Sequence, residues 1–182
     1  MLFRSSDLEG PPQAPVPIFR SEAARRARRY GEAANFILAV LPAEVGTAGG
    51  EDVVRLLYRA FGDVSQKSAA SSALRGLSAR LDARSADAWP MSVLMLHWYA
   101  LLGEIDHAYV IAQRIVTRLE QSRPLITVNL PPIWMPELAE FRSDPRFREF
   151  TNRLGLIEYW NAHGPPDGYR LEQGRLVARE KD

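Results

Sequence analysis

The sequence predicts an all-α protein built from antiparallel helical hairpins and closed by a cap of short helices and a small terminal β-hairpin. Between Ala24 and Leu119, apolar residues recur at spacings of three and four, which is the period of amphipathic helices. Glycines and prolines interrupt this pattern where helices are expected to end. Residues 169–178 instead place two short segments on either side of a glycine, which is typical of a hairpin of two strands.

The first half of the chain predicts a leader and three helices. Prolines recur through residues 11–17, so residues 1–18 are expected to be an extended leader. Ser21 has the position of an N-cap for one long helix that ends at Pro42. A loop over residues 46–50 precedes a helix over 53–61, which Gly62 ends, and apolar residues predict a further helix over 70–81.

The middle of the chain predicts an αα-hairpin. Residues 88–102 are apolar almost all round, as in a central buried helix, and Gly103 ends this helix. Apolar residues then recur from Ile105 to Leu119, and the small Ala108 allows two helix backbones to approach. We therefore expect a helical domain over residues 19–122.

Residues 123–182 predict a cap packed on the same domain. Ser143 or Asp144 can cap a short helix with Pro145 in its first turn, and Gly155 can end that helix in a left-handed conformation. Stacked helices leave apolar surface exposed at the last unit, and an amphipathic tail would cover it.

The helical hairpin has a turn glycine at Gly103, a residue that packs on the turn at Ile105 and a small contact residue at Ala108. In these three positions it resembles the tetratricopeptide repeat. Ile115, by contrast, occupies a position that this repeat normally gives to a small residue.

Residues 134–179 contain five short motifs. They are Trp134, Arg142 with Asp144-Pro145-Arg146-Phe147, Arg153-Leu154-Gly155-Leu156, Tyr159-Trp160 and Gly164-Pro165-Pro166-Asp167. In these motifs the chain resembles the C-terminal ends of bacterial tetratricopeptide-repeat proteins. These include regulators with an N-terminal winged-helix DNA-binding domain and repeat proteins described as adenylate cyclases. Together with the hairpin residues, the motifs give an expected structural signature, comprising Gly103, Ala108, Trp134, Asp144, Pro145, Phe147, Gly155, Tyr159, Trp160, Pro166 and Asp167. We expect Asp144, Arg146 and His163 to hold the tail in place rather than to perform chemistry.

The chain departs from the pattern of these proteins in two respects. The resemblance implies two cysteines flanking the terminal hairpin, at positions that here hold Tyr169 and Ala178, and this chain has no cysteine. The hairpin is therefore expected to be held by packing alone. No winged-helix or cyclase domain is recognisable in the sequence, so no DNA-binding or cyclase activity is inferred.

Two groups of residues suggest sites. Glu104 and His107 have the Glu-x-x-His spacing of metal sites in helical bundles, and His97 lies one helix earlier; a metal-binding or enzymatic domain centred on these three is the alternative hypothesis. An arginine cluster opens the first predicted helix, but acidic residues dilute it, which favours a solvated surface over nucleic-acid binding. Its members are Arg20, Arg25, Arg26, Arg28 and Arg29.

Taken together, the sequence favours a non-enzymatic interaction or sensory module without a cofactor. We expect a protein or peptide partner, or a small effector, in a groove between helices, and no direct nucleic-acid contact because the formal net charge is only +1. The longest strongly apolar run, over residues 91–102, is shorter than the ~20 residues of a membrane span. A bacterial chain is expected to be cytoplasmic as given, or extracytoplasmic as a piece of a membrane-anchored regulator.

Overall fold

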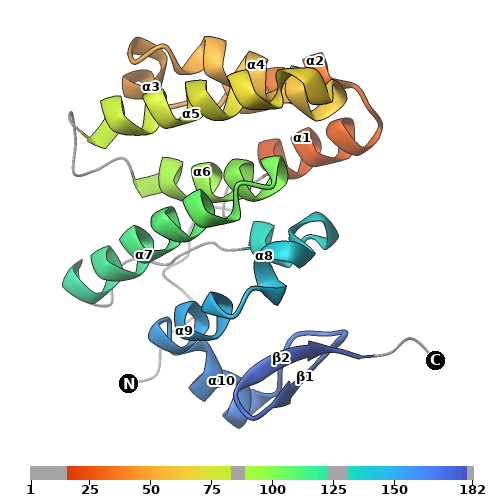
Figure 1. Ribbon diagram of the computed structural model, residues 1–182, viewed down its shortest axis with the longest axis vertical. Coiled ribbons are helices and arrows are strands. Elements are labelled where there is room, and N and C mark those ends of the chain that lie inside the picture. Colours follow the sequence, from red (N-terminus) through yellow and green to blue (C-terminus); the bar gives the residue numbers. More distant parts are fainter. Residues whose placement is uncertain (1–15, 83–88, 123–130, 180–182) are drawn as a thin grey trace, which may run out of the picture. The chain divides into compact units, whose positions relative to one another are not determined.

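The computed structural model describes residues 16–82, 89–122 and 131–179, and this part of the chain is mostly helical (Figure 1). It contains ten α-helices and one antiparallel sheet of two strands, which confirms the predicted class in outline. Within these ranges no helix combines the length and the apolar character needed to cross a bilayer. The chain forms two compact units, Met1–Arg84 and Ser85–Asp182.

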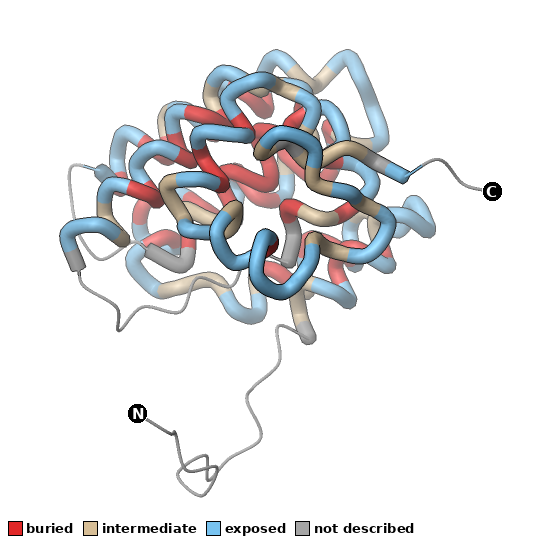
Figure 2. The backbone as a smooth tube through the Cα atoms, turned by 90° about the horizontal axis from the view of Figure 1, so that it is seen from below, coloured by how far each residue is buried: buried red, intermediate tan, exposed pale blue. Residues whose placement is uncertain are grey.

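The N-terminal unit contains five α-helices and one 3-10 helix. They are α1 (Val16–Arg26), α2 (Tyr30–Leu38), α3 (Ala43–Thr47), α4 (Gly50–Gly62), η1 (Val64–Gln66) and α5 (Lys67–Asp82). Helix α1 packs on α2, α2 on α4, and α4 on α5. Fully buried apolar side chains recur at helical spacing, including Leu57 in α4 and Leu74 and Leu77 in α5. Figure 2 shows buried and exposed positions following one another along the helical turns of the chain.

Two predictions for this unit are wrong in part: a single long first helix and an extended leader over residues 1–18. Residues 16–18 already belong to α1, and residues 1–15 lie outside the described part. Ser21 is buried within α1 and does not cap it, because its hydroxyl donates to the carbonyl of Ala33 at 2.9 Å and lies 2.6 Å from the Tyr58 hydroxyl. The chain turns between α1 and α2, where Arg28 has a φ of 58°. Helix α3 also occupies part of the predicted loop.

Arg28→Gly is expected to raise the free energy of unfolding by about 0.5–1 kcal/mol, because a side chain with Cβ is strained in the left-handed region and glycine is not. Urea denaturation followed by far-ultraviolet circular dichroism measures the change. Arg20→Gly, inside α1, is the control and should lower stability through glycine's poor helix propensity. Equal losses for both variants would contradict the strain at Arg28.

The C-terminal unit begins with the predicted αα-hairpin, formed by α6 (Trp89–Leu102) and α7 (Ile105–Ser122). Gly103 has a φ of 79°. Its N–H donates to the carbonyl of Ala100, and the N–H of Glu104 donates to Tyr99, which together form a Schellman motif. The turn therefore needs a residue without Cβ. Ala108 is fully buried in the first turns of α7.

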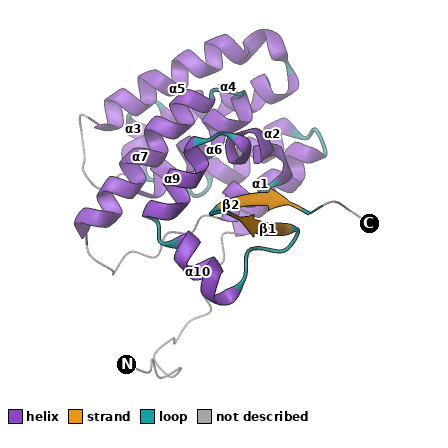
Figure 3. Ribbon diagram, turned by 60° about the horizontal axis from the view of Figure 1, so that its bottom comes forward, coloured by secondary structure: helices purple, strands orange, loops and turns teal. Residues whose placement is uncertain are grey.

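Short elements complete this unit, as Figure 3 shows by secondary structure. They are η2 (Pro131–Trp134), η3 (Pro136–Leu138), α8 (Ala139–Ser143), α9 (Arg146–Arg153), α10 (Leu156–His163), β1 (Tyr169–Glu172) and β2 (Arg175–Ala178). Helices α8 and α9 both contact α7. Gly155, between α9 and α10, has a φ of 72°. Residues 123–130 of the predicted cap lie outside the described part.

The terminal hairpin has a fixed register and more than packing to hold it. Tyr169 pairs with Ala178, so the two positions implied for cysteines lie directly opposite each other. Gln173 and Gly174 both have positive φ, as a two-residue type I′ turn requires. The Tyr169 hydroxyl accepts a hydrogen bond from Nε of Arg142 at 2.9 Å. The expectation of a hairpin held by packing alone is therefore wrong.

Candidate functional site

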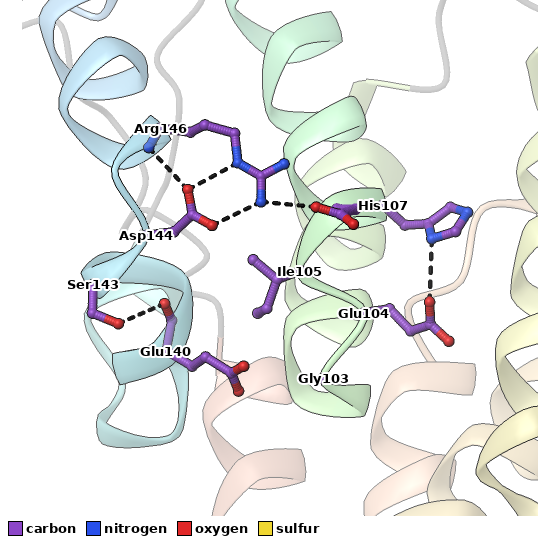
Figure 4. A pocket seen from close by; sticks show the side chains of 9 residues that line it. Gly103, Glu104, Ile105, His107, Glu140, Ser143, Asp144 and Arg146 are labelled. Atoms are coloured by element: carbon purple, nitrogen blue, oxygen red, sulfur yellow. Dashed lines mark hydrogen bonds and ion pairs between the residues drawn. The ribbon is translucent and has the colours of Figure 1, made fainter.

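A pocket of about 470 Å³ lies within the C-terminal unit, between the α6–α7 turn and α8 with the α8–α9 connection (Figure 4). Its lining is rich in carboxylates. The lining residues are Gly103, Glu104, Ile105, Asp106, His107, Glu140, Ser143, Asp144 and Arg146. Two segments distant in the sequence thus form one site.

Helix ends position the acidic side chains on both sides of the pocket. The Schellman turn at Gly103 starts α7, so Glu104 and Asp106 lie at the N-terminal end of that helix, where the helix dipole favours acidic side chains. On the other side, Oδ1 of Asp144 accepts the backbone N–H of Arg146 at 2.9 Å and so caps the start of α9. Glu140 extends from α8 toward the α6–α7 turn in Figure 4.

Arg146 joins the two sides. Its Nε and Nη2 donate to both oxygens of Asp144 at 2.8 and 2.7 Å, and Nη2 also lies 2.9 Å from the carboxylate of Asp106. Its guanidinium carbon lies 4.4 Å from the centre of the Tyr109 ring, in a cation–π contact. Three groups therefore compensate this cation, which makes it a poor site for an anionic ligand.

The same contacts shift the pKa of two groups. The hydrogen bond from Arg146 holds the pKa of Asp144 below its ordinary value, and Asp144 in turn raises the pKa of Arg146. Because the carboxylate pKa is lower in the folded state, its stabilising contribution is present above its unfolded-state pKa. That contribution is lost as the pH falls through the lowered pKa.

Tyr109 holds Arg146 of the pocket lining in place and does not itself act on a ligand. Its side chain is almost fully buried, and its hydroxyl donates to the carbonyl of Phe141 at 2.8 Å. Burial raises the pKa of this phenol, so it stays protonated at neutral pH. The residue is therefore a structural hydrogen-bond donor and not a general base.

The remaining carboxylates give the pocket its acidic character. Glu104 pairs with Nδ1 of His107 at 3.2 Å, and the His107 ring stacks on Tyr99 at 5.4 Å between centroids. The side chain of Glu140 makes no hydrogen bond or ion pair with any other residue that the structure describes. Glu140 is thus the lining carboxylate open to a ligand.

The structure brings together some of the residues identified in the sequence and separates others. Gly103, Glu104, His107 and Asp144 all line the pocket. His97 is buried within α6 and does not line it. In the described ranges no three His, Cys, Asp or Glu side chains are grouped to hold a metal ion, so the residues of the alternative hypothesis form no metal site there.

The other signature residues lie outside the pocket. Trp134 contacts the rings of Phe147, Trp160 and Tyr169 edge to face, at 5.7–6.1 Å between centroids. Tyr159 is more than half exposed on α10. The loop after α10 contains Pro166 and Asp167, and the carbonyl of Pro166 accepts the N–H of Tyr169. Pro145 immediately precedes α9.

No local sequence pattern identifies Glu140 as a site residue. Its position becomes informative only when α8 packs beside the α6–α7 turn. The arginine cluster was visible in the sequence, but two of its members are engaged in ion pairs in the structure. Arg25 pairs with the buried Glu22, and Arg29 pairs with Glu32. Neither pair leaves a cation open to phosphate.

Comparisons of the chain with protein-family models, with curated proteins and with solved structures find no match.

Proposed function

We propose that this chain is a non-enzymatic interaction module whose acidic pocket receives a lysine or arginine side chain of a protein or peptide partner. The open carboxylate of Glu140 carries this proposal, since a buried or half-enclosed cation gains most from a carboxylate that has no other partner.

The charge balance of the pocket supports a cationic ligand. Four lining residues are acidic, and the one lining arginine is already held by Asp106 and Asp144. An incoming carboxylate or phosphate would meet Glu104 and Glu140 with no open cation beside them. The ordered contacts of Arg146 also pre-organise the pocket, which reduces the entropy lost on binding.

The resemblance noted in the sequence adds a context. We propose that α6 and α7 form a tetratricopeptide-like hairpin and that α8, α9 and α10 with the β-hairpin cap it. Such a module would be part of a bacterial regulator or derived from one, and the peptide would be the signal or target that it recognises.

Glu140→Gln is expected to weaken binding of a basic peptide roughly three- to tenfold, because it removes the open charge while keeping the side-chain size. The probe is a fluorescein-labelled peptide of alternating lysine and alanine, and fluorescence anisotropy with the full chain measures its affinity. A peptide with glutamate at each lysine position should not bind at the same concentrations.

The matched control is Glu158→Gln, an exposed carboxylate on α10 outside the pocket, which should leave the affinity unchanged. Equal binding of the basic and acidic peptides would argue against the proposal. So would equal losses in the two variants, because long-range attraction to a general negative surface would explain both.

A further inference from the structure

A second cavity, of about 540 Å³, lies in the N-terminal unit in a groove between α2 and α4, which pack side by side. Tyr30, Gly31 and Ala34 of α2 line one wall, and Asp52, Arg55, Leu56 and Arg59 of α4 line the other. The lining combines an apolar floor with charged residues along its rim.

The groove is open above Gly31. A Cβ at Gly31 would meet no atom within 4 Å, so the chain's own packing does not require glycine there. The Tyr30 ring beside it packs tightly against Gly62, where a Cβ would be only 2.4 Å from ring carbon Cε2. The wall of the groove is therefore fixed, and the space above Gly31 is free.

The charges on α4 are arranged along one face. Arg55 is held by Glu51 at 3.0 Å and by Oδ1 of Asn35 at 3.2 Å, so its charge is compensated. Asp52 and Arg59 are exposed, and their side chains make no ion pair or hydrogen bond with other residues of the described part. They are seven residues apart, which separates them by two helical turns, about 10 Å.

This arrangement is self-complementary. When two copies of α4 lie antiparallel and the two-fold axis passes between Arg55 and Leu56, Asp52 of each copy falls opposite Arg59 of the other. The aliphatic stem of Arg55 falls opposite Leu56 at the same time. An isologous interface has this property, in which one contact is repeated by symmetry. The net charge of +1 adds little repulsion between copies.

We propose that the α2–α4 groove is the interface of a two-fold symmetric homodimer, with two reciprocal Asp52–Arg59 ion pairs across it. Asp52 lies in the first turn of α4 and Arg59 in the last turn, in agreement with the helix dipole. The antiparallel orientation brings each of these ends against the opposite end of the other helix. The second copy supplies apolar surface for Tyr30 and Leu56. The interface is independent of the acidic pocket.

The test is sedimentation velocity of the full chain from micromolar to near-millimolar concentration. The wild-type chain should show a concentration-dependent monomer–dimer equilibrium. Asp52→Arg and Arg59→Asp should each weaken dimerisation about tenfold or more, because each creates like-charge contacts. An equimolar mixture of the two variants should recover the dimer, since their charges are complementary in the heterodimer. The double variant D52R/R59D should also recover it.

Two further variants separate dimerisation from folding. Gly31→Trp should reduce dimerisation by at least about tenfold without lowering the thermal stability of the monomer, because the new side chain enters open space and a helical glycine is removed. Glu44→Arg, an exposed carboxylate on α3 outside the groove, is the matched charge control and should dimerise like the wild type. A monomer at every concentration would overturn the proposal. A dimer that no groove variant weakens, or a mixture that does not recover, would overturn it as well.

Discussion

Phe141→Ala is expected to lower the free energy of unfolding of the C-terminal unit by about 3–5 kcal/mol. The ring is fully buried and stacks on Tyr109 at 4.6 Å. It also meets Phe147 at 5.7 Å and Phe150 at 6.1 Å, edge to face. Alanine would leave a cavity between α7, α8 and α9 and remove these ring contacts, which is why the loss exceeds that of a typical substitution.

Urea denaturation of the full chain, followed by tryptophan fluorescence, measures this loss. All four tryptophans lie within Ser85–Asp182, so the signal reports the unfolding of the C-terminal unit alone. Tyr159→Ala is the control, since this ring is 57% exposed, and it should cost less than about 1 kcal/mol. Similar midpoints for the two variants would show that Phe141 does not organise the core.

Phe141→Ala should also affect the acidic pocket, because Phe141 contacts Tyr109 and Tyr109 contacts Arg146 of the pocket lining. The Phe141 carbonyl accepts the hydroxyl of Tyr109, and the Tyr109 ring supports Arg146. At urea concentrations well below the midpoint, Phe141→Ala should therefore also weaken binding of the basic peptide. Unchanged binding would mean that the pocket does not depend on the aromatic cluster.

Local sequence signals were sufficient for most of the helices. The apolar pattern of α4, α5 and α7 has the helical period, and α6 is an apolar run of helical length. Gly62 is the last residue of α4, and Gly103 follows α6. Gly103 and Gly155 adopt the left-handed conformation without the strain that a side chain brings, so these helix ends can be recognised in the sequence. The β-hairpin was also readable, since a glycine in a two-residue turn is a local requirement.

The break between α1 and α2 could not be predicted from glycines or prolines in the sequence. Arginine occupies the left-handed position at residue 28, where the sequence offers neither glycine nor proline. Ser21 resembles an N-cap but is used in a tertiary contact with Ala33 and Tyr58. Whether a serine caps a helix or bonds to another helix depends on packing, which a local pattern does not contain.

The candidate site was predictable only in pieces. Glu104 and His107 were identified by their spacing, and Asp144 by its place before Pro145. Their common location arises because α8 and α9 pack on α7, which brings Arg146 to Asp106 across a long stretch of sequence. Ion pairs between distant residues leave no periodic signal in a single sequence, so neither this link nor the open Glu140 could be foreseen.

Arg142→Ala is expected to destabilise the C-terminal unit by about 2–4 kcal/mol, because one half-buried guanidinium connects three segments. Its Nη1 donates to the carbonyls of Ile133 and Met135 at 2.6 and 2.8 Å, and its Nε donates to the Tyr169 hydroxyl. The guanidinium also lies 5.8 Å from the centre of the Tyr169 ring. Alanine would leave both carbonyls without this donor and release β1 from η2.

Three variants separate the parts of this connection in the same fluorescence assay. Tyr169→Phe removes one hydrogen bond and keeps the ring, so it should cost about 0.5–1.5 kcal/mol. Arg142→Lys keeps the charge but lacks the planar fork that reaches acceptors in two directions, so its loss should fall between the other two. If Arg142→Ala costs no more than Tyr169→Phe, the two carbonyl contacts contribute nothing to stability. The hairpin would then depend on the packing of Trp134 against Tyr169 instead.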